Sequence, residues 1–392
     1  MRVEDTESQA EFRREARAYL ESIADQAPSG DREIANVEQR RAWQRKLAEG
    51  GLVGVTWPPE QGGRGLGPIE QMITEQELER ADVPGILDFI GVGMLGPAMI
   101  VHGSDEQKER YLGPLLHADE VWCQLFSEPA AGSDLAGIRT KATRRDGEGW
   151  TVNGQKVWTT NAQFASFGML LARTDPSEVK HKGLTMFIVP MDSPGIDVRP
   201  LRQINGDAHF NEIFLDGVEL PDDAVIGGVG NGWAVALTVL MFERLAISGH
   251  ARAFGIELGP LVEAVKEAGA GDDPLVRRRL ADLATDLLAL SAKSNETLLG
   301  LQSGIAPGPE AGLEKITLVE ATIAAGELGA DLFGPGALEP GGRWAEVTSF
   351  APGLRSAGGS NEILANTIGE RVLGLPPEPR ADKGVPFEEL PG

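Results

Sequence analysis

The sequence has little cysteine, few aromatic residues and a deficit of basic side chains. Its one cysteine, Cys123, excludes a disulfide within the chain, and we expect a reducing, cytoplasmic location. The chain has 36 Lys and Arg residues against 59 Asp and Glu residues, a formal net charge of −23, which argues against nucleic acids and anionic membranes as partners. The longest uncharged apolar stretch, residues 89–101, is shorter than the ~20 residues of a membrane span, so we expect no membrane insertion.

Histidine and cysteine patterns typical of metal sites are also missing. The five histidines show no metal-ligand spacing, and Cys123 has no CxxC partner, so we expect no metal and interpret the cysteine as a packed apolar residue. GxSxG is absent, which disfavours a serine hydrolase.

The length of 392 residues favours two or three domains rather than one core. Residues 1–120 are predicted to form an N-terminal helical domain, in which Phe12, Ala16 and Leu20 recur on one helix face and Thr6 or Ser8 provides the cap. Residues 121–229 are predicted to form a middle antiparallel β-barrel or sandwich, and residues 230–392 a C-terminal four-helix bundle with a tail that wraps a surface.

Two turn signals mark the middle region. Asn153-Gly154 and Asp216-Gly217 each separate β-prone runs, which predicts two hairpin turns because both positions favour positive φ. Residues 184–191 and 196–201 are further strand candidates.

The last part reads as helical again. Asn231 is expected to cap a helix from Trp233, and Pro274 to open another. The predicted apolar side of that second helix consists of Leu275, Leu280, Leu283, Leu287, Leu288 and Leu290. Two more helices are expected over residues 313–332 and 360–374.

Two segments of the middle region could bind a cofactor. The loop SEPAAGSD, residues 127–134, joins hydroxyls with a Gly-Ser pair that lets the backbone approach a ligand; it contains neither GK[ST] nor GxGxxG, which disfavours a Walker ATPase or a Rossmann dehydrogenase. In KVWTTN, Trp158 offers a flat ring and Thr160 a hydroxyl, as a flavin ring requires. The alternatives are an ordinary loop and a tryptophan in the core.

Glu243 is the candidate base. Residues 233–242 contain no charge before Glu243 and Arg244 interrupt the apolar run. A helix that is apolar all round is expected to be buried, and burial makes a carboxylate a better proton acceptor. The alternative is a buried structural ion pair.

Together these segments resemble the acyl-CoA dehydrogenase family over almost the whole chain. The matching stretches are residues 51–67, 126–138, 150–162, 209–221, 232–244 and 358–376. The resemblance implies a helical domain, a β-domain and a four-helix bundle, with FAD as cofactor and an acyl-CoA as substrate.

The implied reaction is α,β-dehydrogenation of the thioester to a trans-2-enoyl-CoA. A carboxylate takes the α-proton, the β-hydrogen leaves as hydride to the flavin, and a backbone N–H, here that of Gly358, polarises the thioester carbonyl. Many members carry the base in a Tyr-Glu-Gly-Thr motif, but residues 357–360 read Ala-Gly-Gly-Ser. A subset that resembles isovaleryl- and long-chain acyl-CoA dehydrogenases places the base on the helix that opens the bundle, where Glu243 falls.

The resemblance also implies roles for other residues. Positions that hold the isoalloxazine ring match Phe126, Ser127, Trp158 and Thr160. Ser133 matches a position near the flavin phosphates and the CoA arm, Ser360 a Thr that contacts the cofactor, and Arg244 an Arg that lines the substrate channel.

The family motifs that grip the adenosine half of FAD are not intact in residues 267–280 and 327–338. The chain is therefore expected to form either a homotetramer with a changed grip or a heterotetramer with a related subunit, as in bacterial members that act on sterol-derived acyl-CoAs. Electron-transfer flavoprotein is the expected acceptor. Two alternatives are a non-catalytic or flavin-sharing partner subunit, and a flavin oxidase or monooxygenase on the same fold.

Overall fold

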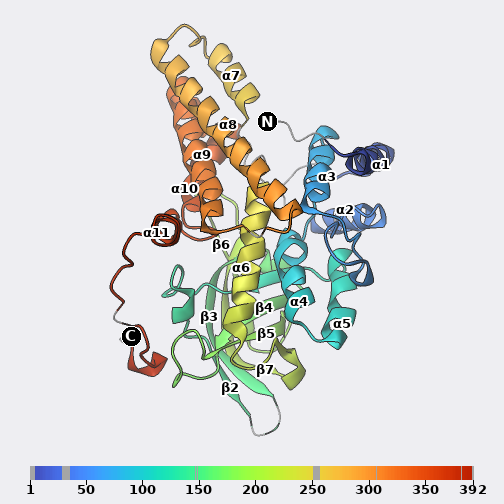
Figure 1. The fold of residues 1–392 in the computed structure, drawn as a ribbon, viewed down its shortest axis with the longest axis vertical. Coiled ribbons are helices and arrows are strands. Elements are labelled where there is room, and N and C mark those ends of the chain that lie inside the picture. Colours follow the sequence, from blue (N-terminus) through green and yellow to red (C-terminus); the bar gives the residue numbers. More distant parts are fainter. Residues whose placement is uncertain are drawn as a thin grey trace. The chain divides into compact units, whose positions relative to one another are not determined.

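The computed structural model describes residues 5–28, 36–145, 147, 149–249, 257–305, 307–380 and 382–390, except for the side chains of residues 244–249 (Figure 1). The chain divides into two compact units. One, the sheet unit, consists of Asp5–Arg202, Ala208–Phe242 and Pro379–Gly392. The other, the bundle unit, consists of Met1–Glu4, Gln203–Asp207 and Glu243–Glu378.

The sheet unit begins with helices, as the sequence predicts. They are α1 (Glu7–Ile23), α2 (Val37–Glu49), α3 (Pro68–Arg80), α4 (Gly96–His102) and α5 (Asp105–Leu116). Thr6 caps α1 through a capping box with Gln9, and Phe12, Ala16 and Leu20 lie on its buried face. Residues 91–96 read GVGMLG, the letters of a dinucleotide motif, but Gly91–Leu95 is a π-helical turn rather than a strand-to-helix loop.

Eight strands form one sheet. They are β1 (Trp122–Leu125), β2 (Lys141–Arg144), β3 (Trp150–Thr160), β4 (Phe167–Arg173), β5 (Leu184–Pro190), β6 (Ile196–Leu201), β7 (Phe210–Leu220) and β8 (Val225–Ile226). Their order is β6-β7-β3-β2-β4-β5-β8, with β1 against β4. The sheet is mixed rather than purely antiparallel, because β1 and β2 both pair with β4 in parallel.

The two predicted hairpin turns are wrong. Asn153-Gly154 and Asp216-Gly217 lie inside the long strands β3 and β7, where the register shifts between Val152 and Gly154. They form one feature, since Asn153 Oδ1 accepts a hydrogen bond from Gly217 N at 2.8 Å and Gly217 adopts a φ of 65°. The positive φ of Gly154 and Gly217 therefore serves a β-bulge. The chain reverses instead between β2 and β3, where Arg145 N donates to Gly149 O at 2.9 Å.

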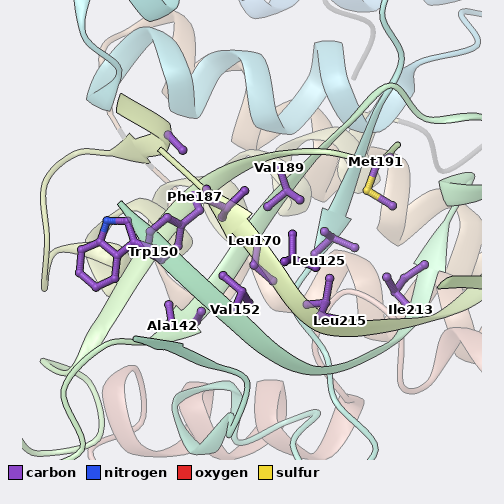
Figure 2. Packing of buried hydrophobic residues seen from close by; sticks show 14 of the residues in the cluster. Leu125, Ala142, Trp150, Val152, Leu170, Phe187, Val189, Met191, Ile213 and Leu215 are labelled. Atoms are coloured by element: carbon purple, nitrogen blue, oxygen red, sulfur yellow. The ribbon is translucent and has the colours of Figure 1, made fainter. Parts of the chain in front are cut away.

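The sheet encloses an apolar core. Figure 2 shows side chains from β1 to β5 and β7 converging on one cluster, with Val152, Leu170 and Phe187 fully buried. Cys123 belongs to this cluster and is buried, as expected. Complete burial of such side chains contributes about 1.5–3 kcal/mol each, which makes the sheet a stiff base for the loops beside it.

The tail returns to the sheet unit. Phe387 N donates to Glu178 O at 2.9 Å, and the Phe387 ring lies under the Arg173 guanidinium at 3.5 Å. Lys180 forms ion pairs with Asp382 of the tail and with Asp134 of the candidate cofactor loop. The tail thus covers a loop, as the sequence predicts.

The bundle unit has more helices than predicted. Among the described residues they are α7 (Leu258–Glu267), α8 (Pro274–Gln302), α9 (Gly312–Phe333), α10 (Arg343–Leu354) and α11 (Asn361–Arg371), with α6 (Gly232–Gly249) leading into it from the sheet unit. Asn231 precedes α6, but its side chain donates to Gly227 O instead of capping the helix.

The apolar face predicted for α8 is partly wrong. Leu283 and Leu290, seven residues apart, are buried, whereas Leu275 and Leu288 are 72% and 69% exposed. A helix of 29 residues presents only one stripe to its neighbours, and these two leucines lie outside that stripe.

Candidate functional site

Trp158 occupies a strained bulge in β3. Between Lys156 and Thr159 the strand advances three residues while β7 advances two, so β3 carries one extra residue there. Trp158 adopts a φ of 60°, which is rare for a bulky residue, and its side chain is 61% exposed. The alternative of a core tryptophan is therefore wrong, because the bulge turns the indole outward.

The loop after β1 lies against this bulge. Ser127 O accepts a hydrogen bond from Val157 N at 2.9 Å, which joins the loop to β3 one residue before Trp158. Ser127 and Thr160 are half-buried, and Ser133 is exposed. The side chain of Phe126 is buried, so this residue offers its backbone rather than its ring to a ligand.

These features fit a flat, polar-edged ring such as a flavin. The outward indole provides a packing face, and the hydroxyls of Ser127 and Thr160 lie on the two segments that flank it. Two buried atoms of these strands, Thr159 Oγ1 of β3 and Asn211 Oδ1 of β7, have no hydrogen-bond partner among the described residues. Buried polar atoms without partners are uncommon, and they are expected where a ligand or water completes the site.

A buried ion pair behind the loop was missed by the sequence reasoning. Lys156 is fully buried on β3, and its Nζ donates to Glu128 Oε1 at 2.8 Å. Burial raises the pKa of Glu128, but the Lys156 ammonium and donors at residues 139 and 140 outweigh it and hold that pKa below its usual value. The signal was present in GQKVW, where strand alternation places Lys156 on the same inward face as Val152.

The bundle unit carries the candidate base. Glu243 lies on α6 and is half-buried. The expectation that this helix is buried all round is wrong, because Val235 and Val239 are buried whereas Leu237 and Met241 are 46% and 38% exposed. The neighbouring Arg244 lies in α6, but its side chain is outside the described part of the chain.

Lys315 holds the loop before α11 in place. Its Nζ donates to Arg355 O at 3.1 Å, Gly359 O at 2.9 Å and Asn361 Oδ1 at 2.8 Å. Burial lowers the pKa of Lys315 to about 8, against the opposing influence of Glu243 and two other carboxylates, Glu320 and Glu362. The sequence analysis did not single out Lys315, since a lysine in a helical run is usually exposed.

The same loop contains the other two predicted residues of this unit. Gly358 and Gly359 adopt φ values of 62° and 91°, which explains the glycine pair. Ser360 caps α11, with its Oγ accepting a hydrogen bond from Ile363 N at 3.3 Å. Lys315 therefore fixes the backbone on both sides of Gly358.

The segments without intact adenosine motifs contact each other. Arg279 Nη1 of α8 donates to Asp331 Oδ2 of α9 at 2.5 Å. Arg278, beside it, is 79% exposed in its ion pair with Asp282. Both arginines are thus paired with carboxylates of the bundle unit.

Two classes of site were also searched for among the described residues. No group of three or more His, Cys, Asp or Glu side chains there is arranged to hold a metal ion. No helix in that part of the chain combines the length and apolarity needed to cross a membrane.

Comparisons with known proteins identify the family of the chain. Three family models match: the acyl-CoA dehydrogenase N-terminal domain over residues 6–119, the middle domain over residues 123–218 and the C-terminal domain over residues 230–373. Acyl-CoA dehydrogenase IpdE1 of Mycobacterium tuberculosis is 41% identical over 352 residues, which covers 88% of this chain and 91% of that protein.

Two solved structures are similar over nearly the whole chain. The Tcur3481-Tcur3483 steroid ACAD superposes with a TM-score of 0.82 at 28% identity, covering 96% of this chain and 100% of that one. The ChsE4-ChsE5 complex from Mycobacterium tuberculosis gives a TM-score of 0.78 at 28% identity, with the same coverage.

Proposed function

The chain belongs to the acyl-CoA dehydrogenase family of flavoproteins, oxidoreductases that act on a CH–CH bond, and on that premise we propose that Glu243 is its base and FAD its cofactor. The observation that carries the proposal is the loop that contains Gly358, which Lys315 holds through hydrogen bonds to Arg355 O and Gly359 O, in the same unit as the half-buried carboxylate Glu243.

The chain's own groups have separate tasks. Glu243 accepts the α-proton of the acyl-CoA, and the N–H of Gly358 donates to the thioester carbonyl, where negative charge develops as the proton leaves. Bound FAD supplies the acceptor for the β-hydride. Lys315 limits the movement of the loop, so that the Gly358 N–H is oriented before the substrate arrives.

The residues proposed to hold the cofactor fall into two groups. Trp158, Thr160, Ser127 and the Phe126 backbone would contact the isoalloxazine ring, with the outward indole of Trp158 as the packing face. Ser133 would lie near the flavin phosphates and the CoA arm, Ser360 near the cofactor, and Arg244 along the substrate channel. Support comes from the exposure of Trp158 and Ser133 on neighbouring segments of the sheet unit.

Replacement of Glu243 by Gln tests the base. We expect Glu243→Gln to bind FAD as the wild type does but to lose the bleaching of the flavin absorbance on addition of acyl-CoA, because an amide cannot accept the α-proton. Glu263→Gln, an exposed carboxylate on α7, is the matched control and should bleach normally. Bleaching of the Glu243→Gln protein at the wild-type rate would show that another group is the base.

We also propose a substrate class and a partner. The similarity to a steroid ACAD and to the ChsE4-ChsE5 complex favours a bulky, ring-containing acyl-CoA and a tetramer shared with a related subunit that completes the adenosine site. The departures in residues 267–280 and 327–338 support the shared site. Native mass measurement with the bound flavin counted tests it: one FAD in each subunit of a homotetramer would contradict it.

Three further expectations stand as proposals. Electron-transfer flavoprotein is the proposed electron acceptor. The single buried cysteine supports a cytoplasmic location. Domain boundaries are proposed after residues 120 and 229.

A further inference from the structure

We propose that the buried pair Lys156–Glu128 is a positioning device, which holds the loop after β1 against the bulge of β3 and thereby presents Trp158 and Ser127 to the flavin. The proposal rests on the flavin site proposed above, but its geometry concerns only residues of the sheet unit.

Lys156 directs all its donors at two other segments, the loop after β1 and β4. Its Nζ contacts Phe126 O at 3.0 Å, Glu128 Oε1 at 2.8 Å and Leu171 O of β4 at 2.8 Å. An ammonium has three N–H donors, so these contacts use its full capacity. One buried cation therefore joins β3, β4 and both sides of Ser127.

Glu128 extends the connection to a fourth segment. Its carboxylate accepts from Arg139 N at 2.6 Å and from Thr140 N at 2.9 Å, just before β2. The backbone of Glu128 also exchanges hydrogen bonds with Ala131, which closes the loop into a tight turn. The loop is consequently fixed at its middle as well as at its ends.

The strained residue lies two positions after this anchor. Trp158 keeps an unfavourable backbone conformation and an exposed indole, and such strain persists only where the surroundings over-determine it. The surroundings here are the Lys156 side chain, the bond from Val157 N to Ser127 O and the bond from Asn211 Nδ2 to Thr159 O at 3.0 Å. Each of these three contacts constrains either a residue next to Trp158 in β3 or the loop after β1.

A role in stability alone is a weaker explanation of the pair. The face on which Lys156 lies is apolar, with Val152 and Ile213 both fully buried, and an apolar pair of similar size is often at least as stabilising as a buried ion pair. A lysine that donates to a carbonyl and a carboxylate of the loop and to a carbonyl of β4 fits control of conformation better than filling of space.

The experiment uses the double variant Lys156→Met/Glu128→Gln, which removes both charges together. Hydrogen–deuterium exchange of the flavin-free protein is measured over residues 126–134 and 157–161, and FAD affinity and visible circular dichroism are measured on the folded protein. Glu77→Gln is the control for general destabilisation, because Glu77 is a buried carboxylate of the same unit bonded to Arg13, Arg17 and Arg80 on the helices.

The double variant is expected to exchange faster in both segments and to bind FAD about tenfold more weakly, the loss that corresponds to about one charged hydrogen bond. Its visible circular dichroism should differ from wild type, while Glu77→Gln should retain the wild-type exchange in these segments and the wild-type flavin spectrum. If the double variant does not fold, Glu128→Gln alone, which keeps the Lys156 donors, should show the same local change to a smaller degree.

Unchanged exchange in both segments of a folded variant, with wild-type FAD affinity, would overturn the positioning role. Equal effects from Glu77→Gln would also overturn it, since the cause would then be general instability. A wild-type protein that never binds FAD would refute the proposed cofactor instead, and the exchange measurement would then decide on the loop alone.

Discussion

Lys315 is the residue whose ionisation state should be visible in stability. Burial lowers the pKa of Lys315 in the folded protein to about 8, against 10.5 for an ordinary lysine. Between these two values the unfolded chain keeps a proton that the folded protein has released. Raising the pH through that window therefore favours the folded state at this site.

We expect the free energy of unfolding of the wild type, minus that of Lys315→Met, to grow as the pH rises from about 8 to about 10.5. Urea denaturation of both proteins across this window measures the difference. Lys266→Met, which removes an exposed lysine of the same unit, controls for the loss of one charge. A difference that shrinks with rising pH would mean that Lys315 stays charged in the folded protein.

At the scale of residues, some features of the site can be recognised in the sequence and others cannot. Trp158 and Glu243 are visible as residue types that break their local pattern. The oxygen atoms that accept from Lys156 and Lys315 belong to residues 15 to 46 positions away, so no local pattern contains them. Those contacts exist only once the chain has folded.

At the scale of elements, the bulge shared by β3 and β7 gives a prediction about two glycines. Gly217 has a φ of 65° with open space where a Cβ would lie, whereas a Cβ on Gly154 would lie 2.4 Å from Thr140 Oγ1. We expect Gly217→Ala to cost about 1–2 kcal/mol, the penalty for a left-handed backbone alone. Gly154→Ala should cost more, because it adds a steric clash to an unfavourable φ.

Thermal unfolding of the two variants checks this order. Equal destabilisation would imply that Thr140 moves aside without cost. A neutral Gly217→Ala would imply that the bulge relaxes to a regular ladder.

Elements with a clear boundary signal were predicted well. The strand Ile196–Leu201 has the expected ends because turn residues flank it, and Thr6, one of the two expected caps, begins α1. The Asn-Gly and Asp-Gly pairs gave a wrong prediction because the glycine with positive φ that a hairpin turn needs can also serve a β-bulge. Only the pairing of β3 with β7, which is set by non-local contacts, distinguishes them.

At the scale of the whole molecule, exposed leucines of α8 give a prediction about assembly. Leu288 and Leu299 are 69% and 37% exposed and lie 11 residues apart, close to three helical turns. Leucines in a row on a charged helix suggest a surface covered by another subunit. We expect Leu288→Asp to lower the native mass of the assembly without altering the circular dichroism of the chain.

Ala289→Asp is the matched control, because Ala289 is an exposed neighbour about 100° further around the helix. Native mass spectrometry of both variants beside the wild type measures the effect. An unchanged mass for Leu288→Asp would show that this part of α8 faces solvent in the assembly.

The sequence by itself determined the family and the order of helical and β-rich segments, and it supplied the candidate residues of the site, because these depend on local periodicity, turn chemistry and motif order. Tertiary structure alone decided that Trp158 faces outward, that two turn signals join in one bulge, and that buried lysines hold the loops at Ser127 and Gly358. The physical reason is the range of the interactions: a hydrogen bond between distant segments has no signature in either segment until the packing of the core brings them together.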